Sequence, residues 1–336
     1  MNFKTKCKNK LVPVSNYQAS NGEKTVVSVC VGTYNQVDYV EHCLDSILSQ
    51  LVNFKVEILI NDDASSDGTQ ELLLDYQKRF PQIIKVFLSE ENQFQKTKQY
   101  FIVYRVHAPR ISGKYVALCD SDDYYCNNLM LYSKVLALEK HKECNACFSR
   151  VRKMNESNKT TIHLMPKRFY KTGVIPSKKL IGMFTKSYCF QTSSYFFKAD
   201  KYIEFCNNYP TFAQKINVFD EPVVMYFGSL GKVYYINKVF SVYRKFSNNS
   251  WSNSKNENDI SQRIIGQQKR IDYLEEFNKS TGYRFNKACN WGITHSKITI
   301  YKLSGDIDSI FKDKQLLKFY KRRYFKNYIK LKYFKH

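Results

Sequence analysis

The chain has 336 residues, of which 43% are hydrophobic, so it can bury a large core. Lysine and arginine exceed aspartate and glutamate by 23, and such an excess attracts phosphate wherever it is exposed. No apolar run approaches the roughly 18 to 20 residues that cross a bilayer, which argues against a membrane-spanning or secreted class. We therefore expect a cytoplasmic protein with one large domain and an additional region.

Ten cysteines are spread along the chain, most of them within predicted strands or helices. This distribution favours buried free thiols in a reducing compartment. Cys144 and Cys147 have the spacing of a zinc-binding pair, but no second pair of suitable spacing completes the site. The six histidines show no metal-ligand spacing either. We expect no zinc site of this kind.

Alternating strands and helices are predicted after a polar, flexible lead-in at residues 1–24. β-branched runs at residues 26–31 and 56–60 predict buried strands, and each is followed by a polar turn and then by apolar residues at helical spacing. Further strands are predicted at residues 83–88 and 115–119, with candidate strands near residues 194–198 and 232–236. The alternation predicts an α/β fold with a mostly parallel, Rossmann-like sheet flanked by helices.

Polar clusters follow three of these strands. Thr33–Asn35 come after the first strand, Asp62 and Asp63 after the second, and residues 120–123 after the fourth. Ligands of parallel sheets bind outside the carboxyl ends of the strands, which meet at one edge. The three clusters are therefore expected to converge on one binding site.

Three carboxylates occupy four positions in the run Asp120, Ser121, Asp122 and Asp123. Their mutual repulsion would cost stability unless a cation neutralised it. Magnesium and manganese bind such oxygens and bridge to the phosphate oxygens of a nucleotide. The alternative is an acidic turn in which Asp122 or Asp123 caps a helix beginning near residue 127.

The cluster after the second strand mixes helix capping with ligand binding. Ser66 or Asp67 can cap the following helix. Capping does not explain two acids directly at the strand end, where Asp62 could accept the N3 hydrogen of a uracil-like base. Tyr34 could stack on that base, and the alternative for Tyr34 is an ordinary half-buried tyrosine in a turn.

The segments VVSVCVGTYN at residues 26–35, DDASSDGT at 62–69 and DSDDYY at 120–125 resemble, in order and spacing, the family 2 glycosyltransferases, which have the GT-A fold. The resemblance covers roughly residues 26–150. It implies an inverting transferase that uses a nucleotide diphosphate sugar, most often UDP-linked, and a divalent metal, Mn²⁺ or Mg²⁺.

The resemblance also implies which residues bind the donor. Gly32, Tyr34 and Asp62 would touch the base, Asp120 and Asp122 would lie on the ribose side, and Asp122 or Asp123 would hold the metal. The whole expected nucleotide-sugar site consists of Gly32, Tyr34, Asn35, Asp62, Asp63, Asp120, Ser121, Asp122 and Arg244.

A weaker resemblance continues downstream. The segment from Phe219 to Val224 resembles the family's segment that carries the catalytic base, which assigns this role to Asp220, with Glu221 as a rival. The alternative for Asp220 is a helix N-cap. Arg244 resembles a family residue near the diphosphate, although Phe246 stands where histidine is frequent in the family.

The remainder is expected to be helical and basic. The predicted domains are the GT-A domain at residues 25–240 and a helical region at 241–336. Residues 312–336 contain ten lysines or arginines and one acid, interleaved with aromatic residues. This tail favours peripheral contact with the inner face of a membrane or a plain solvated tail, and nucleic acid much less.

The sequence thus predicts transfer of a hexose or N-acetylhexosamine to a glycan, lipid-linked or protein-linked acceptor. The alternative is a non-catalytic protein of the same fold that binds a nucleotide sugar, or that associates with membrane or nucleic acid. Nucleotidyl transfer is disfavoured because the turn after the first strand has one glycine, Gly32, rather than a glycine-rich phosphate loop.

Overall fold

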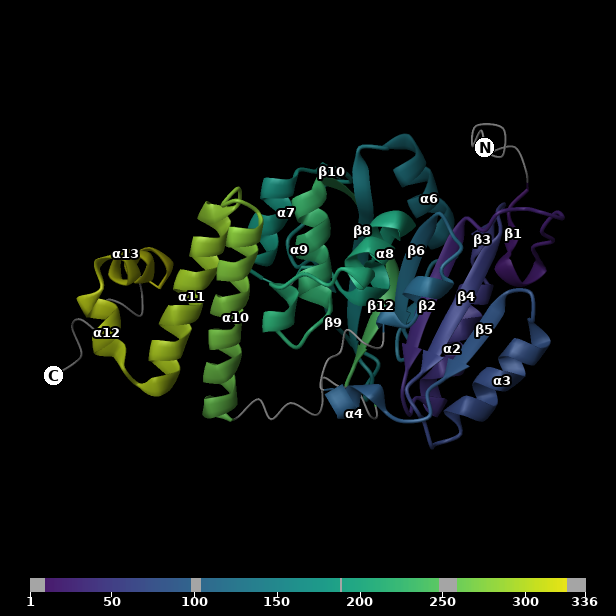
Figure 1. Ribbon diagram of the computed structural model, residues 1–336, viewed down its shortest axis with the longest axis horizontal. Coiled ribbons are helices and arrows are strands. Elements are labelled where there is room, and N and C mark those ends of the chain that lie inside the picture. Colours follow the sequence, from purple (N-terminus) through teal and green to yellow (C-terminus); the bar gives the residue numbers. More distant parts are fainter. Residues whose placement is uncertain (1–9, 98–103, 188, 248–258, 325–336) are drawn as a thin grey trace. The chain divides into compact units, whose positions relative to one another are not determined.

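The computed structural model describes residues 10–97, 104–187, 189–247 and 259–324. The chain divides into two compact units, of which unit 1 comprises residues 1–209 and 217–255, and unit 2 comprises residues 210–216 and 256–336. Unit 1 is an α/β domain and unit 2 is helical (Figure 1).

A ten-stranded mixed sheet forms the centre of unit 1, in the order β10-β12-β8-β11-β6-β2-β4-β5, with β7 on β12 and β9 on β8. The strands are β2 (Val27–Thr33), β4 (Val56–Asp62), β5 (Ile84–Leu88), β6 (Tyr115–Asp120), β7 (Tyr124–Tyr125), β8 (Cys144–Asn155), β9 (Thr161–Met165), β10 (Gly173–Ile175), β11 (Phe196–Lys198) and β12 (Lys232–Lys245). Strands β6, β2, β4 and β5 lie side by side and parallel, which confirms the predicted Rossmann-like part (Figure 1). The short β11 runs antiparallel to both β6 and β8 and joins this part to the rest.

Helices cover the sheet, whose central strands are mostly apolar. Every residue of β2 and β4 is buried, as expected for strands covered on both faces. The helices of unit 1 are α2 (Val37–Leu48), α3 (Thr69–Arg79), α4 (Gln93–Thr97), α6 (Met130–Lys140), α7 (Ser177–Phe184), α8 (Ala199–Asn207) and α9 (Asp220–Leu230). The connections from each parallel strand to the next helix lie at the carboxyl edge of the sheet, where the polar loops are found.

A buried carboxylate connects the amino ends of the parallel strands. Glu57 accepts hydrogen bonds from the Ser28 hydroxyl (2.6 Å) and the Ser112 N–H (2.8 Å), and it pairs with Lys85 (3.1 Å). Burial raises the pKa of Glu57, but these hydrogen bonds outweigh burial and hold the pKa below its usual value. Next to Ser112, a Cβ on Gly113 would lie only 2.6 Å from the Ser28 nitrogen, so only glycine fits there.

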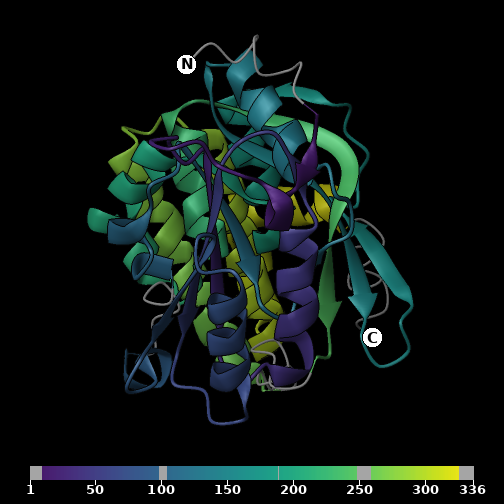
Figure 2. The same ribbon diagram turned by 90° about the vertical axis from the view of Figure 1, so that its right-hand side faces the viewer.

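The strand β12 is much longer than the strand predicted near residues 232–236. It has 14 residues, pairs with β8, β10 and β7, and curves strongly (Figure 2). Its register against β8 shifts three times, and such bulges bend a strand and interrupt the alternation of side chains that sequence patterns detect. The predicted domain boundary at residue 240 falls inside β12.

Part of the predicted lead-in belongs to unit 1. Val12–Pro13 form β1, which pairs with β3 (Leu51–Val52), and Val14 is 1% exposed in the hydrophobic core. The sequence pattern here consists of two valines, one on either side of Pro13, and such a short pattern does not indicate a strand. Residues 1–9 lie outside the described residues.

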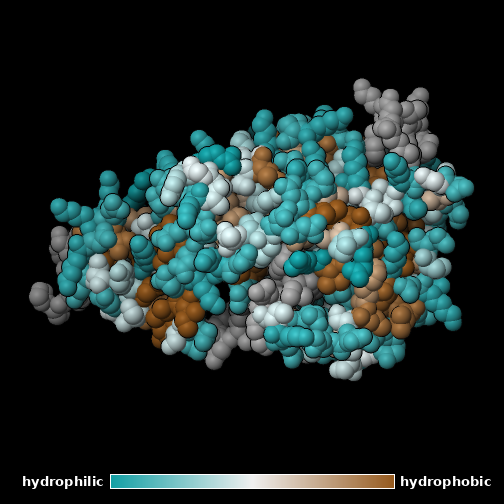
Figure 3. Space-filling view, viewed as in Figure 1, coloured by the Kyte–Doolittle hydropathy of each residue, from teal (hydrophilic) through white to brown (hydrophobic). Residues whose placement is uncertain are grey.

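Unit 2 consists of α10 (Ile260–Ser280), α11 (Asn286–Ser304), α12 (Ile307–Lys312) and α13 (Lys314–Arg323), as expected for the helical region. A small core of Ile298, Ile310, Leu316 and Tyr320 joins the last three helices. The face of unit 2 visible at the left of Figure 3 is mostly hydrophilic with smaller hydrophobic areas. None of the helices described here is long and apolar enough to cross a membrane. The end of the predicted basic tail, residues 325–336, lies outside the described residues.

Candidate active site

The pairing register of the parallel strands brings the three predicted loops together. Gly32 of β2 pairs with Asp120 of β6, and Thr33 pairs with Asp62 of β4. The loops are also joined directly, because the Ser121 N–H donates to the Gly32 carbonyl (3.1 Å). The acidic residues after β4 and β6 therefore flank the end of β2 at one edge of the sheet.

Asp62 and Asp63 are both buried and both shape the loops. Asp62 accepts hydrogen bonds from the Ser65 N–H (2.9 Å), the Ser65 hydroxyl and the Gln70 side chain (2.6 Å). Asp63 accepts from the backbone N–H groups of residues 93 and 94 at the start of α4 (2.8 and 3.1 Å). Asp63 is therefore the cap of a short helix, a role that the sequence pattern did not indicate.

The turn after β2 is locked to the loop after β4. Asn35 has a left-handed backbone (φ 50°), its N–H donates to the Ser65 hydroxyl (2.8 Å), and its side-chain oxygen accepts from the Ser66 N–H (2.8 Å). Tyr34 immediately before it is half-buried. The hydroxyl of Ser65 thus lies between Asn35 and Asp62 and joins the loops after β2 and β4.

Asp120 lies in a crowded acidic environment. The Tyr104 hydroxyl donates to one of its oxygens, and the Tyr104 ring stacks on Phe219 with a centroid distance of 4.3 Å. Burial, followed by the charge of Asp122, raises the pKa of Asp120 to about 7, and Asp220 adds to the rise while the Tyr104 hydrogen bond opposes it. A nearby cation would lower this pKa and stabilise the ionised form of Asp120.

Asp123 is fully buried and points into the protein. It accepts hydrogen bonds from the Arg244 N–H (3.1 Å) and from the side-chain amide of Gln191 (2.7 Å). Burial and the charges of Asp122 and Asp120 raise the pKa of Asp123 well above its usual range. Neither Asp122 nor Asp123 caps α6, which begins with Leu129 at its N-cap and has no side-chain cap.

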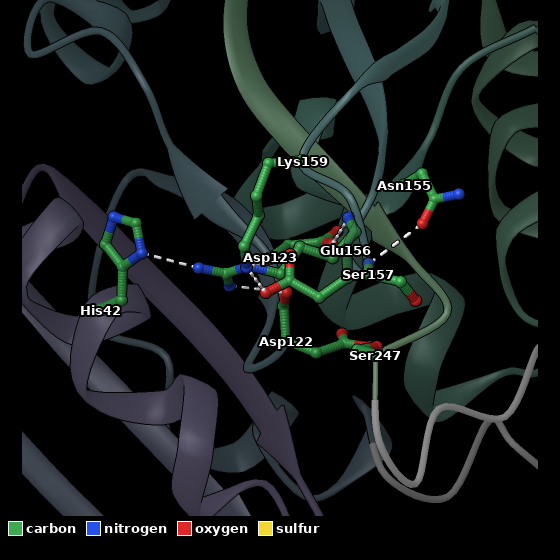
Figure 4. Close-up of polar contacts among 9 residues, drawn as sticks. His42, Asp122, Asp123, Asn155, Glu156, Ser157, Lys159 and Ser247 are labelled. Carbon is green, nitrogen blue, oxygen red and sulfur yellow. Dashed lines mark hydrogen bonds and ion pairs between the residues drawn. The ribbon is translucent and has the colours of Figure 1, made fainter.

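Asp122 is held by the end of β12 (Figure 4). The Ser247 hydroxyl donates to its carboxylate (2.9 Å), and Nη1 of Arg244 donates to its backbone carbonyl (2.8 Å). Arg244 is only 4% exposed, and it also contacts His42 and Glu156. Arg244 therefore contacts protein groups that fix the acidic turn.

Asp220 is the first residue of α9 and lies near the acidic turn. Its charge contributes to the raised pKa of Asp120, and its own Oδ1 accepts from the N–H of Glu221 (2.9 Å). The Tyr195 hydroxyl donates to the Asp220 carbonyl (3.2 Å). Asp220 is half-buried, whereas Glu221 is 8% exposed. The N-cap of α9 is Phe219, so Asp220 is not that cap.

Sequence reasoning missed several residues of this site. His42 projects from α2, Tyr104 comes from a segment without a clear pattern, and Glu156 lies in the turn between β8 and β9. No spacing signal marks them, because each is brought in by tertiary packing. Gln191 also belongs to this site, because its side-chain amide donates to Asp123.

The residues of the acidic turn fit a divalent metal only if a bound nucleotide supplies further oxygen atoms to coordinate it. Among the described residues, no three histidine, cysteine or acidic side chains surround a single point. Magnesium sites that bind nucleotides use one or two carboxylates together with phosphate oxygens. Of the two predicted metal residues, Asp122 is half-buried at the surface of the turn, and Asp123 has both oxygens engaged inside it.

Comparison with known proteins agrees with this geometry. The family model "Glycosyl transferase family 2" matches residues 28–199, just over half of the chain. An uncharacterised protein of Mycobacterium tuberculosis is 34% identical over 138 residues, which cover 39% of this chain and 36% of that protein. A putative teichuronic acid biosynthesis glycosyltransferase of Bacillus subtilis is 36% identical over 100 residues, covering 30% of this chain and 37% of the relative. The chain thus matches little more than a third of these relatives' length.

Solved structures confirm the GT-A-like fold. Staphylococcus aureus TarS, solved in complex with UDP, superposes with a TM-score of 0.58 and 15% identity over 86% of this chain and 76% of that chain. GalNAc-T7, solved with UDP, GalNAc and Mn²⁺, gives a TM-score of 0.53 and 12% identity over 83% of this chain and 59% of that chain.

Proposed function

This chain belongs to glycosyl transferase family 2, and on that premise we propose that it transfers one sugar from a nucleotide diphosphate donor to an acceptor hydroxyl with inversion. The proposed donor is a UDP-linked hexose or N-acetylhexosamine. UDP is the nucleotide bound in the structures of TarS and GalNAc-T7, and a uracil base suits an acceptor group such as Asp62 at the end of β4.

The observation that carries this proposal is the acidic turn at the carboxyl end of β6. β6 pairs directly with β2, and β2 pairs with β4, so a nucleotide laid along this edge meets the ends of all three strands. We propose that Tyr34 and Asp62 face the base and that Asp120 and Asp122 face the ribose and diphosphate. Asp63, Asn35 and Ser121 would shape the loops around them.

Asp122 is the proposed metal ligand. A divalent ion bound there would stabilise the negative charge that develops on the departing diphosphate. The protein holds Asp122 ready through Ser247 and Arg244. Asp120, whose pKa burial and Asp122 raise to about 7, would gain its charge when this cation is present.

Asp220 is the proposed catalytic base. It would take the proton of the acceptor hydroxyl as that oxygen bonds to the anomeric carbon from the face opposite the diphosphate. The bond between this carbon and the diphosphate oxygen breaks in the same step, and the nucleoside diphosphate leaves. Holding the three groups in line supplies much of the acceleration.

The proposed acceptor is a glycan or a lipid-linked sugar, in agreement with the Bacillus relative's name. We further propose that the chain touches an anionic membrane surface electrostatically. The exposed face of α13 carries Lys314, Lys318, Lys321 and Arg322, while its apolar face packs inside unit 2. Lipid insertion through that apolar face would therefore require opening the core of unit 2.

The proposed reaction is tested by release of free nucleoside diphosphate from UDP-, GDP- and dTDP-sugars with Mn²⁺ or Mg²⁺. We expect slow, metal-dependent hydrolysis of one UDP-sugar by the intact chain and its loss in Asp122→Ala. Asp75→Ala is the matched control, because Asp75 is an exposed acid on α3 that pairs only weakly with Arg79 (3.5 Å). This control should keep full activity.

Two other outcomes have distinct meanings. Binding of UDP by calorimetry without any turnover would support the alternative of a nucleotide-sugar-binding protein. If no nucleotide sugar is hydrolysed and none binds, the transferase proposal is wrong.

A further inference from the structure

His42 of α2 and Arg244 of β12 contact each other in unit 1, although they are 202 positions apart in the chain. Nη2 of Arg244 lies 2.6 Å from Nδ1 of His42. An arginine can only donate, so Nδ1 of His42 must accept and cannot carry a proton. The contact therefore exists only while the imidazole is neutral.

The same arginine is held from two other directions. Its Nε lies 3.3 Å from Glu156, and its Nη1 donates to the backbone carbonyl of Asp122 (2.8 Å). Its guanidinium also lies over the ring of Tyr124, 4.6 Å from the centroid. Nη1 and Nη2 thus each have a hydrogen-bond partner, Nε forms an ion pair with Glu156, and the partner of Nη1 belongs to the acidic turn.

We infer that His42 and Arg244 are positioning residues for the acidic turn, and that protonation of His42 in mildly acidic solution loosens the turn and weakens donor binding. This inference rests on the proposed function of the site. In this inference Arg244 acts by holding Asp122 in place, in addition to any contact with phosphate. His42, which lies outside the predicted site, acts by orienting Arg244.

The surroundings of His42 contain charges of both signs. Its ring stacks on Tyr124 with a centroid distance of 4.2 Å. Burial, followed by the positive charge of Arg244, lowers the pKa of His42, and Lys159 acts in the same direction. Asp45 and Glu156 oppose this by raising it. The net lowering means that the imidazole is neutral at pH 7.5 and takes up its proton only below its usual pKa.

Packing against Tyr124 and Arg244 removes part of the water around the His42 ring, but the residue is exposed as a whole, so its proton can exchange with solvent. Protonated His42 would place a second positive charge against the guanidinium and would remove the acceptor that orients it. Arg244 keeps Glu156 and the Asp122 carbonyl as partners, so the turn would loosen and not collapse.

The test compares the full-length protein with His42→Asn and His42→Phe. Asparagine offers a side-chain oxygen near the position of Nδ1 and does not titrate, whereas phenylalanine keeps the ring but removes the acceptor. Binding of UDP with Mn²⁺ is measured by calorimetry at pH 7.5, 6.5 and 5.5. Because the phosphate of UDP also titrates in this range, only differences between the proteins at one pH are interpreted.

At pH 7.5 we expect His42→Phe to bind UDP about fivefold more weakly than the wild type, the effect of losing one hydrogen bond. His42→Asn should bind within about twofold of the wild type, because one acceptor replaces another. At pH 5.5 the wild type should approach His42→Phe, while His42→Asn keeps its advantage. Identical pH profiles for the wild type and His42→Asn would overturn the inference.

A ligand-free measurement separates this inference from the proposed function. Nitrogen NMR of ¹⁵N-labelled histidine should show unprotonated Nδ1 for His42 at pH 7.5 and a rise in its pKa in Arg244→Gln. A His42 that carries its proton on Nδ1 would overturn the inference even if UDP binds. Absence of UDP binding by a wild type with the expected NMR result would count against the donor proposal alone.

Discussion

At the scale of single residues, the two acids at the start of α9 are distinguished by their surroundings. Asp220 is half-buried close to Asp120, whereas Glu221 is 8% exposed. We expect Asp220→Asn to reduce kcat about 100-fold or more and to leave UDP binding unchanged, as for loss of a general base. Glu221→Gln should reduce kcat much less. Equal losses in both variants, or a larger loss in Glu221→Gln, would assign the base to Glu221.

A buried lysine gives a second residue-scale prediction. Lys134 of α6 is fully buried, its Nζ donates to the Ser194 carbonyl (2.7 Å), and burial lowers its pKa from 10.5 to about 7. The unfolded chain therefore binds the extra proton between pH 7 and 10.5, and the contribution of Lys134 to stability rises with pH in that window.

The measurement is urea unfolding of the wild type and Lys134→Met at pH 7, 8 and 9. The free energy of unfolding of the wild type, relative to the variant, should rise by roughly 1.4 kcal/mol per pH unit at most. A difference that stays constant with pH would show that Lys134 keeps an ordinary pKa. The absolute difference also includes the Ser194 carbonyl left without its donor, so only the slope is diagnostic.

The candidate site could be predicted from the sequence in part, at this scale. Asp120, Asp122 and Asp220 stand in recognisable runs directly after a strand or at the start of a helix, and the structure places them near one another. His42 and Glu156 could not be found, because α2 and the β8–β9 turn meet Arg244 only after folding. A pattern along one element contains no information about such partners.

At the scale of elements, the parallel strands depend on the close approach at Gly113. A Cβ there would lie 2.6 Å from the Ser28 nitrogen, so Gly113→Ala should lower the free energy of unfolding by about 2 kcal/mol or more. Gly182→Ala is the matched control, because no atom lies within 4 Å of a Cβ at Gly182 in α7. It should be neutral or stabilising by about 0.5–1 kcal/mol. The measurement is chemical denaturation of both variants. Equal changes in the free energy of unfolding would contradict the argument from close packing at Gly113.

The same scale explains which elements were predictable. β2 and β4 contain β-branched and other apolar runs that end in polar turns, so their ends were placed to within two residues. β12 was underestimated, because its bulges interrupt the alternation, and β1 was missed, because two residues give no period. Long-range pairing determines both strands.

At the scale of the whole molecule, part of the excess of positive charge is concentrated on one helix of unit 2. Lys314, Lys318, Lys321 and Arg322 occupy one exposed face of α13, and the acid before this helix, Asp313, is engaged with the N–H groups of residues 315 and 316 (2.7 and 3.0 Å). Electrostatic adsorption through such a face depends on anionic lipid and on salt.

We expect the full chain to sediment with vesicles that contain anionic lipid at low salt, and to be released at high salt. Replacing Lys318 and Arg322 by glutamate should reduce binding about tenfold or more, since each basic residue near the surface contributes about 1 kcal/mol. The control replaces Lys78 and Lys140, which are exposed in unit 1, by glutamate and so changes the net charge equally. Equal losses of vesicle binding in both double variants would contradict a binding surface on α13. Stronger binding of the chain to nucleic acid than to anionic vesicles would identify nucleic acid, and not a membrane, as the partner of this surface.

Asp122 is held by residues that come much later in the chain, and this limits how far the gene can be shortened from its 3′ end. Its two holders, Arg244 and Ser247, follow it by 122 and 125 positions in the chain. A nonsense mutation between positions 220 and 244 leaves Asp120, Asp122, Asp123 and Asp220 encoded, yet removes both Arg244 and Ser247. Natural truncations and recombination break points that preserve sugar transfer should therefore fall beyond residue 247. A shorter relative would need another pair of groups to hold the residue equivalent to Asp122.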